Sequence, residues 1–330
     1  MGFRKGVPSM KTLWYDFRHA LCMGLMVPVL LMPTLLRLFG GPGEMPEFSA
    51  PEEGFDGSVS VTLAGGEVRS LEEYLTCVLL GEMPGDFPEE ALKAQAVAAR
   101  TYTRKAMTTG RKHDGALCTD AGCCQAFRTP EEYLRQGGNR ENLDRVREAV
   151  GATDGLVLTY EGDYIEATFF SCSGGRTEDA AEVWGVDYPY LRATDSPGEE
   201  WASSYRDTTL YSRQELEESL GITLSGEASG WLGTLERTRG GGVKTLVLGD
   251  RVFSGTELRE KLRLRSTAFT AEPEGTGLRF ETQGYGHRVG LSQCGANAMA
   301  REGADFREIL AHYYPGTRVE SEPIGKSVEN

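Results

Sequence analysis

Residues 81–102 read GEMPGDFPEEALKAQAVAARTY, and this stretch organises the chain around a helix, a corner and a second helix. Pro84 disfavours helical geometry at the residue before it, so the first helix should end near Glu82. A second helix should begin at Pro88, where acidic residues follow at the positive end of the helix dipole. The alanine-rich run 91–99 has high helix propensity and lets other elements pack closely. Glu82, a carboxylate at such a corner, is a candidate catalytic acid.

Two cations of the second helix, Lys93 and Arg100, lie seven residues apart, which is nearly two full turns. Both side chains should therefore lie on one helix face, roughly 10 Å apart along the axis. A charged helix face is most often simply solvated. The alternative is that these cations line a binding site beside Glu82.

The 330-residue chain has a net charge of −14 and enough apolar residues for one large domain or two smaller ones. Residues 1–39 hold five cations and one acid, so the remainder carries −18. This acidic body lacks the basic surface that binds nucleic acid, so no nucleic-acid partner is expected.

An uncharged run from Ala20 to Leu36 follows the N-terminal cations. As a helix it spans about 25 Å, short of the roughly 30 Å hydrocarbon core, but Leu38 and Phe39 extend it if Arg37 snorkels. The preceding positive charge predicts a cytoplasmic N-terminus, and no small-x-small cleavage site is evident. We therefore expect a cytoplasmic tail over 1–19, a retained transmembrane anchor over 20–39 and a linker over 40–56.

The body, residues 57–320, alternates between helical and strand patterns, and we expect an α+β fold of helices and antiparallel strands that form a groove. Ser70 and Glu73 form a capping-box pattern at the start of the first helix. Residues 212–265 should form a smaller inserted α/β subdomain, and 321–330 a disordered tail. Strands are expected over 58–63, 67–70, 156–160, 164–171 and 278–282, and helices over 71–82, 88–107, 142–150 and 292–302.

Residues 113–125, HDGALCTDAGCCQ, hold three of the seven cysteines and one of the four histidines. Zinc takes four such ligands in a tetrahedron, although the adjacent Cys123 and Cys124 would crowd one metal. A disulfide between Cys118 and either of them is the alternative for an extracytoplasmic protein. Free thiols in an anaerobic organism are a third interpretation.

Two glycine-rich motifs are further candidates. Residues 170–177 read FSCSGGRT, and the glycines would let a ligand approach the backbone, although an ordinary turn is the alternative. Ser171 lies outside any nucleophile-elbow pattern, which argues against a serine hydrolase. Residues 283–296 read QGYGHRVGLSQCGA, and glycines frame His287 at a strand–helix junction, although a lone histidine is more often structural. The aromatic-rich stretch 184–201 fits either core packing or sugar binding by stacking.

These motifs together resemble the stage II sporulation protein D family, membrane-anchored lytic transglycosylases of endospore formers. The resemblance runs from about residue 58 to 319 and keeps three separated motifs in order. It differs at Arg288, where the family usually has glycine, at Leu291, where it usually has methionine, and at Cys294, which replaces a common aromatic residue. The motifs are EMP at 82–84 with ALKAQA at 91–96 and ARTY at 99–102, SCSGGRT at 171–177, and GH at 286–287 with GLSQ at 290–293 and GA at 295–296.

The resemblance implies that Glu82 is the catalytic acid. It also implies a structural zinc ion, with Cys123 where many family members carry histidine, and no organic cofactor. The expected zinc ligands are His113, Cys118, Cys123 and Cys124. The residues expected to position the glycan are Lys93, Arg100, Ser171, Ser173, Tyr285, His287, Ser292 and Gln293.

Hydrolytic glycosidases need two carboxylates, but only Glu82 lies at a motif centre here, which suits a lytic transglycosylase. The resemblance implies cleavage of MurNAc–GlcNAc bonds in denuded peptidoglycan strands to 1,6-anhydro ends during engulfment. It places the body in the space between mother cell and forespore, with glycan strands and membrane-bound engulfment machinery, including an amidase, as partners. A non-catalytic wall-binding activator of an amidase and a zinc hydrolase are the alternatives.

Overall fold

The computed structural model describes residues 59–110 and 113–322. The predicted cytoplasmic tail, anchor and linker therefore lie outside the described residues. Within those ranges, no helix has both the length and the apolar character needed to cross a bilayer.

The helix–corner–helix unit forms as the sequence predicts. Helix α2 (Leu71–Glu82) begins with the capping box of Ser70 and Glu73, in which each side chain bonds the backbone N–H of the other residue. Met83 follows α2 with extended backbone, at φ −139° and ψ 152°, so the helix ends at Glu82 as expected. Helix α3 (Glu89–Thr109) begins directly after Pro88.

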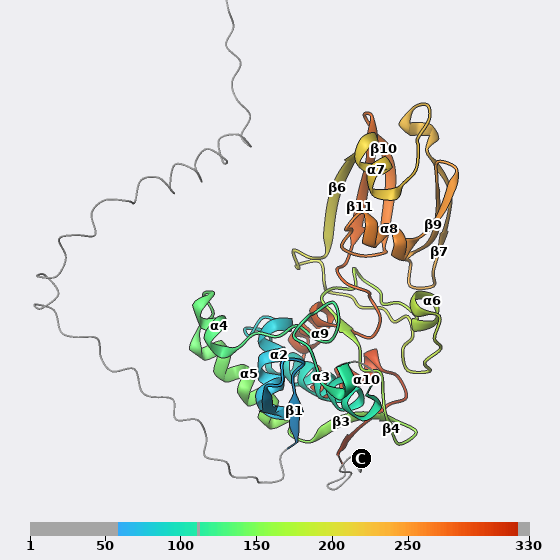
Figure 1. The fold of residues 1–330 in the computed structure, drawn as a ribbon. Coiled ribbons are helices and arrows are strands. Elements are labelled where there is room, and N and C mark those ends of the chain that lie inside the picture. The colour runs from blue at the N-terminus through green and yellow to red at the C-terminus, as the bar shows by residue number, and fades with distance from the viewer. Residues whose placement is uncertain (1–58, 111–112, 323–330) are drawn as a thin grey trace, which may run out of the picture. The chain divides into compact units, whose positions relative to one another are not determined.

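Helix α3 lies at the centre of the main hydrophobic core. It packs against α2, α5 (Arg140–Ala152), α9 (Gln293–Arg301) and α10 (Phe306–Tyr313) (Figure 1). Its alanines at 91, 94, 96, 98 and 99 are completely buried, so neighbouring helices can approach its backbone closely.

A three-stranded antiparallel sheet, in the order β13-β3-β4, packs against α3. Its strands are β3 (Leu156–Tyr160), β4 (Asp163–Tyr164) and β13 (Arg318–Ser321). The tail predicted over 321–330 therefore starts too early, because Ser321 pairs with Leu156 and Glu322 forms an ion pair with Arg104. Residues 323–330 lie outside the described residues.

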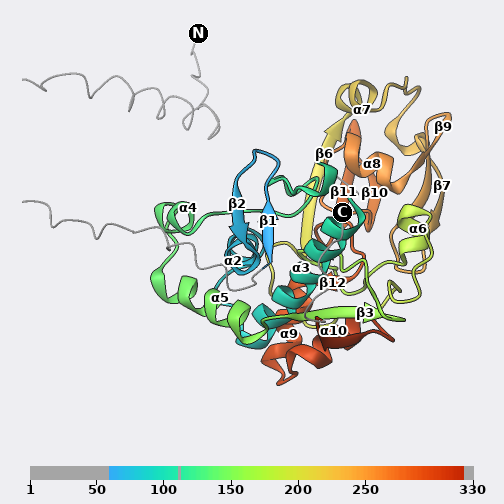
Figure 2. The ribbon, with the colours of Figure 1, turned by 60° about the horizontal axis from the view of Figure 1, so that its bottom comes forward.

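The inserted subdomain has a hydrophobic core of its own, and its elements gather away from α2, α3 and α5 (Figures 1 and 2). It extends beyond the predicted 212–265 on both sides, because flanking strands complete the antiparallel sheet β10-β11-β6 and contribute core residues such as Phe269 and Phe280. A second antiparallel sheet has the order β7-β8-β9. The elements are β6 (Arg206–Ser212), α7 (Arg213–Leu220), η2 (Ala228–Gly230), β7 (Leu232–Arg237), β8 (Val243–Leu248), β9 (Arg251–Ser254), α8 (Gly255–Lys261), β10 (Phe269–Glu274) and β11 (Gly277–Gln283).

One short parallel pair brings two distant motifs together. Strand β5 (Phe169–Phe170) leads into the FSCSGGRT motif, and β12 (Leu291–Ser292) directly precedes α9. The two strands pair in parallel, with Phe169 opposite Leu291 and Phe170 opposite Ser292. The other sheets are antiparallel, so the predicted α+β class is confirmed. The remaining elements are β1 (Ser60–Thr62), β2 (Val68–Ser70), η1 (His113–Gly115), α4 (Pro130–Arg135) and α6 (Ala180–Trp184).

Candidate functional site

Glu82, at the end of α2, is held by two donors from distant parts of the chain. Its Oε1 accepts a hydrogen bond from the Ala126 N–H at 2.7 Å, and its Oε2 accepts one from Gln293 Nε2 at 3.1 Å. Gln293 is the first residue of α9, which the β5–β12 pair positions. The corner, the residue directly after the 113–125 loop and the GLSQ motif therefore meet at one carboxylate.

The lack of a side chain at Gly81 allows the backbone at Ala126 and Phe127 to pack against the end of α2. A Cβ at position 81 would lie 2.8 Å from the Phe127 nitrogen and 2.9 Å from the Ala126 carbonyl carbon, closer than side chains tolerate. Because these are backbone atoms, they could not move aside cheaply. The glycine before Glu82 is therefore a steric requirement of the Ala126 contact, and the sequence alone gave no sign of it.

Burial raises the pKa of the Glu82 carboxyl above its ordinary value, and the hydrogen bonds from Ala126 and Gln293 only partly oppose that rise. Nearby apolar side chains such as Leu79 and Met83 are buried in the main core. The protonated form of Glu82 therefore persists to higher pH than in an exposed glutamate.

Two adjoining cavities of about 520 and 560 Å³ meet at Glu82, which lines both together with Ser171 and Tyr285. We call the pair of cavities the groove, the cavity of about 520 Å³ its first lobe and the cavity of about 560 Å³ its second lobe. The first lobe extends past Trp201 and the second past Trp184, and both walls include residues of the inserted subdomain. The expected groove is therefore present, and Glu82 lies between its lobes.

Exposed aromatic rings line the groove on both sides of Glu82. Trp201 is 50% exposed, Tyr285 49% and Trp184 40%. By contrast, Tyr190 from the same aromatic-rich stretch is buried in the main core. Large rings that stay exposed along a groove are suited to stacking on the apolar faces of sugars.

His287 lines the second lobe, between the rings of Phe170 and Trp184 at centroid distances of 5.5 and 5.2 Å. Burial, reinforced by the positive charge of Arg259, lowers the pKa of His287 to about 4. Its Nδ1 accepts a hydrogen bond from the Val289 N–H at 3.2 Å. At neutral pH, His287 is therefore an uncharged ring in the groove wall.

Of the residues predicted to position glycan, Ser171, Tyr285, His287 and Gln293 line the groove with Glu82. The prediction for Arg100 is wrong, because its side chain has no exposed surface and bonds Glu72 at 2.8 Å and the Val150 carbonyl at 3.2 Å. Lys93 does not line the groove either; it forms ion pairs with Glu89 and Glu90 on its own helix, at 2.6 and 2.9 Å.

The prediction that Ser173 and Ser292 position the glycan is also wrong, because both side chains are completely buried. Both bind Glu199, a residue that sequence reasoning missed. Its Oε2 accepts hydrogen bonds from Cys172 Sγ and from the Ser173 backbone and hydroxyl, at 2.9–3.2 Å. Further donors are Gly174 N at 2.9 Å on Oε2, and Ser196 Oγ at 2.7 Å and Ser292 Oγ at 2.6 Å on Oε1. Glu199 thus fixes the SCSGG and GLSQ motifs side by side.

Arg288, where the resemblance led us to expect glycine, has the left-handed backbone, at φ 65°, that favours glycine. Its guanidinium forms a buried ion pair with Glu178 at 3.0 Å and donates to the carbonyl oxygens of Ser173 and Gly240 at 2.7 and 3.0 Å. The arginine therefore fastens the SCSGG motif to a loop of the inserted subdomain.

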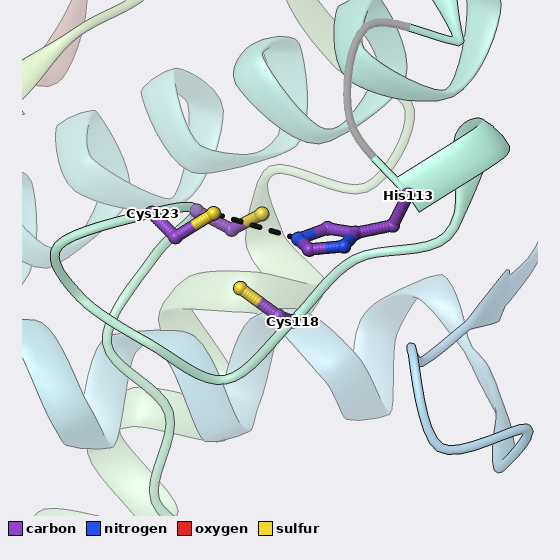
Figure 3. A group of neighbouring side chains, drawn as sticks. His113, Cys118 and Cys123 are labelled. Carbon is purple, nitrogen blue, oxygen red and sulfur yellow. Dashed lines mark hydrogen bonds between the residues drawn. The ribbon is translucent and has the colours of Figure 1, made fainter.

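The 113–125 loop places four candidate metal ligands, three thiols and one imidazole, close together. The ligand atoms of His113, Cys118, Cys123 and Cys124 all lie within 4.8 Å of one another, and Cys123 Sγ is 3.4 Å from His113 Nε2. Figure 3 shows the imidazole and the labelled thiols facing a common centre. Neighbouring ligands around a tetrahedral zinc lie about 3.5–3.8 Å apart, so the set fits that ion.

The turn at Asp120 explains how adjacent cysteines share this centre. The Asp120 carbonyl accepts hydrogen bonds from the N–H groups of both Cys123 and Cys124, at 3.0 and 2.8 Å. Burial opposes ionisation of the Cys118 thiol, but hydrogen bonds from the Asp120 backbone and from neighbouring ligands lower its pKa to about 7. Zinc binds the thiolate form, which Cys118 therefore reaches readily, whereas burial raises the pKa of Cys124 to about 11.

Comparison with known proteins identifies the family. A family model described as "SpoIID: Stage II sporulation protein" matches residues 64–160. Stage II sporulation protein D of Bacillus amyloliquefaciens is 38% identical over 255 residues, 76% of this chain and 74% of the relative. The protein of that name from Bacillus subtilis (strain 168) is 38% identical over 254 residues, with the same coverage. An "Amidase enhancer" of Bacillus subtilis is 31% identical over 304 residues, 74% of this chain and 40% of the relative. The chain therefore belongs to the stage II sporulation protein D family.

Proposed function

We propose that this protein is a peptidoglycan lytic transglycosylase that cleaves MurNAc–GlcNAc bonds of denuded strands and leaves 1,6-anhydro ends. The observation that carries the proposal is the count of acids. Among the described residues that line the two lobes, Glu82 is the sole carboxylate. Hydrolytic glycosidases require a second carboxylate to activate water or to attack the sugar, whereas closure of an anhydro ring needs only one group that gives and takes a proton.

In the proposed mechanism, protonated Glu82 first donates its proton to the glycosidic oxygen. The raised pKa keeps part of the carboxyl groups protonated for this step. The resulting carboxylate then accepts the proton of the muramic C6 hydroxyl as that oxygen attacks C1 and closes the anhydro ring. The bonds from Ala126 and Gln293 orient the carboxyl group for both transfers. Ser171, Tyr285 and the two exposed tryptophans would hold sugars on either side of the bond.

The loop ligands His113, Cys118, Cys123 and Cys124 would hold a structural zinc ion. Four protein ligands leave no open position for substrate, so the ion would contribute rigidity to the fold. Cys124 lies two residues before Ala126, and the intervening Gln125 is fixed by bonds to Tyr74 OH at 3.2 Å and Thr103 Oγ1 at 3.0 Å. A rigid loop would thus hold the Ala126 N–H against Glu82.

Metal analysis of freshly purified full-length protein tests the zinc site. One zinc per chain is expected, with loss of the metal in Cys118→Ser but not in Cys77→Ala, whose buried thiol lies elsewhere. A protein that holds no metal would remove the zinc from the proposal. A chelator should weaken activity only as the loop loosens; immediate loss with an unchanged fold would instead favour a zinc hydrolase.

We propose that the protein works from the cell membrane as a single-pass protein, with the described domain in the space between mother cell and forespore. The uncharged run at 20–36 and the cations before it support this placement. Membership in a family of stage II sporulation proteins supports a role in sporulation, and we propose that this role is engulfment beside membrane-bound machinery. The similarity to a relative named "Amidase enhancer" supports an amidase among the partners.

A second function is favoured by one comparison, the similarity to a relative named "Amidase enhancer". On this alternative, the groove binds wall glycan without cutting it and presents an amidase with its substrate. Mass spectrometry of denuded glycan strands incubated with the full-length protein separates the two functions. Transglycosylase activity gives shortened strands with 1,6-anhydro ends. Intact strands, combined with faster turnover of an added amidase, would establish the enhancer role.

A further inference from the structure

Two arginines of the inserted subdomain face the groove from opposite sides of Glu82. Arg259, on α8, lines the lobe that contains His287 and Trp184, whereas Arg263, in the turn after α8, lines the lobe that contains Trp201. Each lobe beside the proposed catalytic acid is therefore lined by at least one arginine from the same short segment.

Neither guanidinium has an acidic partner among the residues that the structure describes. Arg259 uses only its Nε, which donates to the Arg265 carbonyl at 3.3 Å, so its two terminal amino groups remain available. Arg265 lines the first lobe too, but it is already engaged by Asp207 at 3.2 Å and by the Ser203 carbonyl at 3.1 Å. Arg259 and Arg263 are thus the groove arginines with free capacity for an anion.

Arg263 has a backbone conformation that is costly for arginine. Arg263 has a left-handed backbone, with φ 51°, directly after the end of α8, where glycine is the usual residue. Its backbone N–H donates to the Glu260 carbonyl at 3.3 Å, but its exposed side chain makes no hydrogen bond or ion pair within the described chain. Arginine here costs conformational energy that glycine would avoid, and its guanidinium gives the fold no hydrogen bond or ion pair in return.

We propose that Arg259 and Arg263 bind the free lactyl carboxylates of peptide-stripped muramic acid and so make the groove selective for denuded strands; this inference rests on the proposed function. A muramic residue carries a free carboxylate only when no peptide is attached, because the peptide converts that group to an uncharged amide. Every second sugar of the strand bears a lactyl group. A strand bound across Glu82 therefore presents one on each side of the cleaved bond.

Charge and geometry agree with this assignment. A chain with a net charge of −14 would otherwise repel a glycan that carries one negative charge per disaccharide. The planar guanidinium donates two parallel hydrogen bonds to a carboxylate, and such pairs are stronger than neutral ones. An amide in the same place offers one acceptor oxygen and no charge, and the attached peptide adds bulk in the lobe.

Two matched glycan oligomers test the proposal with the full-length protein. They differ only at the lactyl group, a free carboxylate in one and a methylamide in the other. The wild type should cleave the carboxylate oligomer with at least about tenfold higher kcat/KM. Arg259→Gln and Arg263→Gln should each lose about tenfold on that oligomer and almost nothing on the amide, while Arg→Lys variants keep part of the preference. Lys244→Gln, an exposed charge loss on β8 outside the groove, is the matched control.

The possible outcomes distinguish a failure of the arginine assignment from a failure of the proposed transglycosylase activity. Equal cleavage of both oligomers by the wild type would overturn the arginine assignment and leave the transglycosylase proposal intact. Equal losses on both oligomers in the glutamine variants would show that the arginines merely support the fold. If neither oligomer is cleaved, the transglycosylase proposal fails. Calorimetric binding of the same oligomers then still decides whether the two arginines read the carboxylate.

Discussion

Glu82 and Glu199 are two carboxylates that both bind the GLSQ motif, Glu82 at Gln293 and Glu199 at Ser292, and they differ in how many donors surround them. Glu199 is completely buried and accepts hydrogen bonds from six donor atoms, so both of its oxygens are fully used. Glu82 accepts two and lines the groove. Glu199 has no lone pair left for a ligand and serves to hold its neighbours in place. Glu82 keeps lone pairs that can exchange a proton with a ligand.

The largest effect is expected from Glu82→Gln, which removes the exchangeable proton and keeps the shape. Cleavage of denuded strands should fall by about a thousandfold or more, while glycan binding stays close to wild type and the melting temperature does not fall. Asp86→Asn, at an exposed position in the same corner, should change neither. Release of anhydro-ended fragments, measured by mass spectrometry, checks the prediction. Turnover that survives the substitution would refute the role of Glu82.

Glu199→Gln should produce the opposite pattern, a loss of stability that exceeds the loss of chemistry. The new NH2 group would face the donors of one former carboxylate oxygen, so either the donors of Oε2, which include Ser173, or those of Oε1, Ser196 and Ser292, would lose their acceptor. We expect the free energy of unfolding to fall by about 3 kcal/mol. Urea denaturation measures it, with the exposed neighbour substitution Glu200→Gln as control. Unchanged stability would mean that donor count does not distinguish the two carboxylates.

Gly81→Ala should separate position from chemistry at Glu82. The added methyl group would push the Ala126 backbone away from the carboxylate, because its nearest contacts are backbone atoms at 2.8 and 2.9 Å. We expect kcat to fall by about tenfold to a hundredfold with the acid itself intact. Gly151→Ala on α5 is the control, since a Cβ there meets nothing within 4 Å. Equal kcat in both variants would show that the Ala126 contact is dispensable.

Gln293→Leu should shift the pH profile of cleavage. The Gln293 hydrogen bond lowers the pKa of Glu82, so its removal should raise that pKa further. The first step needs protonated Glu82, and the alkaline limb of kcat should therefore move to higher pH. The maximal rate should fall as well, because the carboxyl group loses one of its two orienting bonds. A limb that moves to lower pH would contradict this account.

The sequence predicted local features of the site well and long-range contacts poorly. The corner at Glu82 and the clustered ligands at 113–124 depend on neighbouring residues, and both appear where expected. Arg100 was misjudged because helical spacing gives the face of a side chain but not what covers that face. Glu199 was missed because it stands outside every motif, and its donors come from segments up to 93 residues away.

The groove arginines are a second case in which the sequence does not predict a long-range contact. Arg259 and Arg263 look like ordinary charges of a helix end, and the sequence assigns them to an insertion without a role. Only the packing of that subdomain beside Glu82 brings them to the groove. What the sequence cannot provide is therefore the set of contacts between segments that are distant in the chain.

The smallest expected effect concerns stability, and it follows from the sign of the Glu82 pKa shift. An acid whose pKa is raised in the folded state binds its proton more tightly there than in the unfolded chain. Its stabilising contribution is fully present below the unfolded pKa, about 4.3, and is lost as the pH rises through the folded value. Glutamine does not titrate. Glu82→Gln should therefore gain stability relative to wild type between those two pKa values and keep a constant advantage above them.

Urea denaturation of both proteins from pH 4 to pH 8 measures this difference. An advantage that grows with pH and then levels off would show that ionised Glu82 strains the fold, as a proton donor in a partly dry groove must. A difference that stays flat across this range would show that water solvates the carboxylate fully. The contrast with Glu199 would then lie in its donors alone and not in the proton affinity of Glu82, and the proposed proton transfer would lose its physical basis.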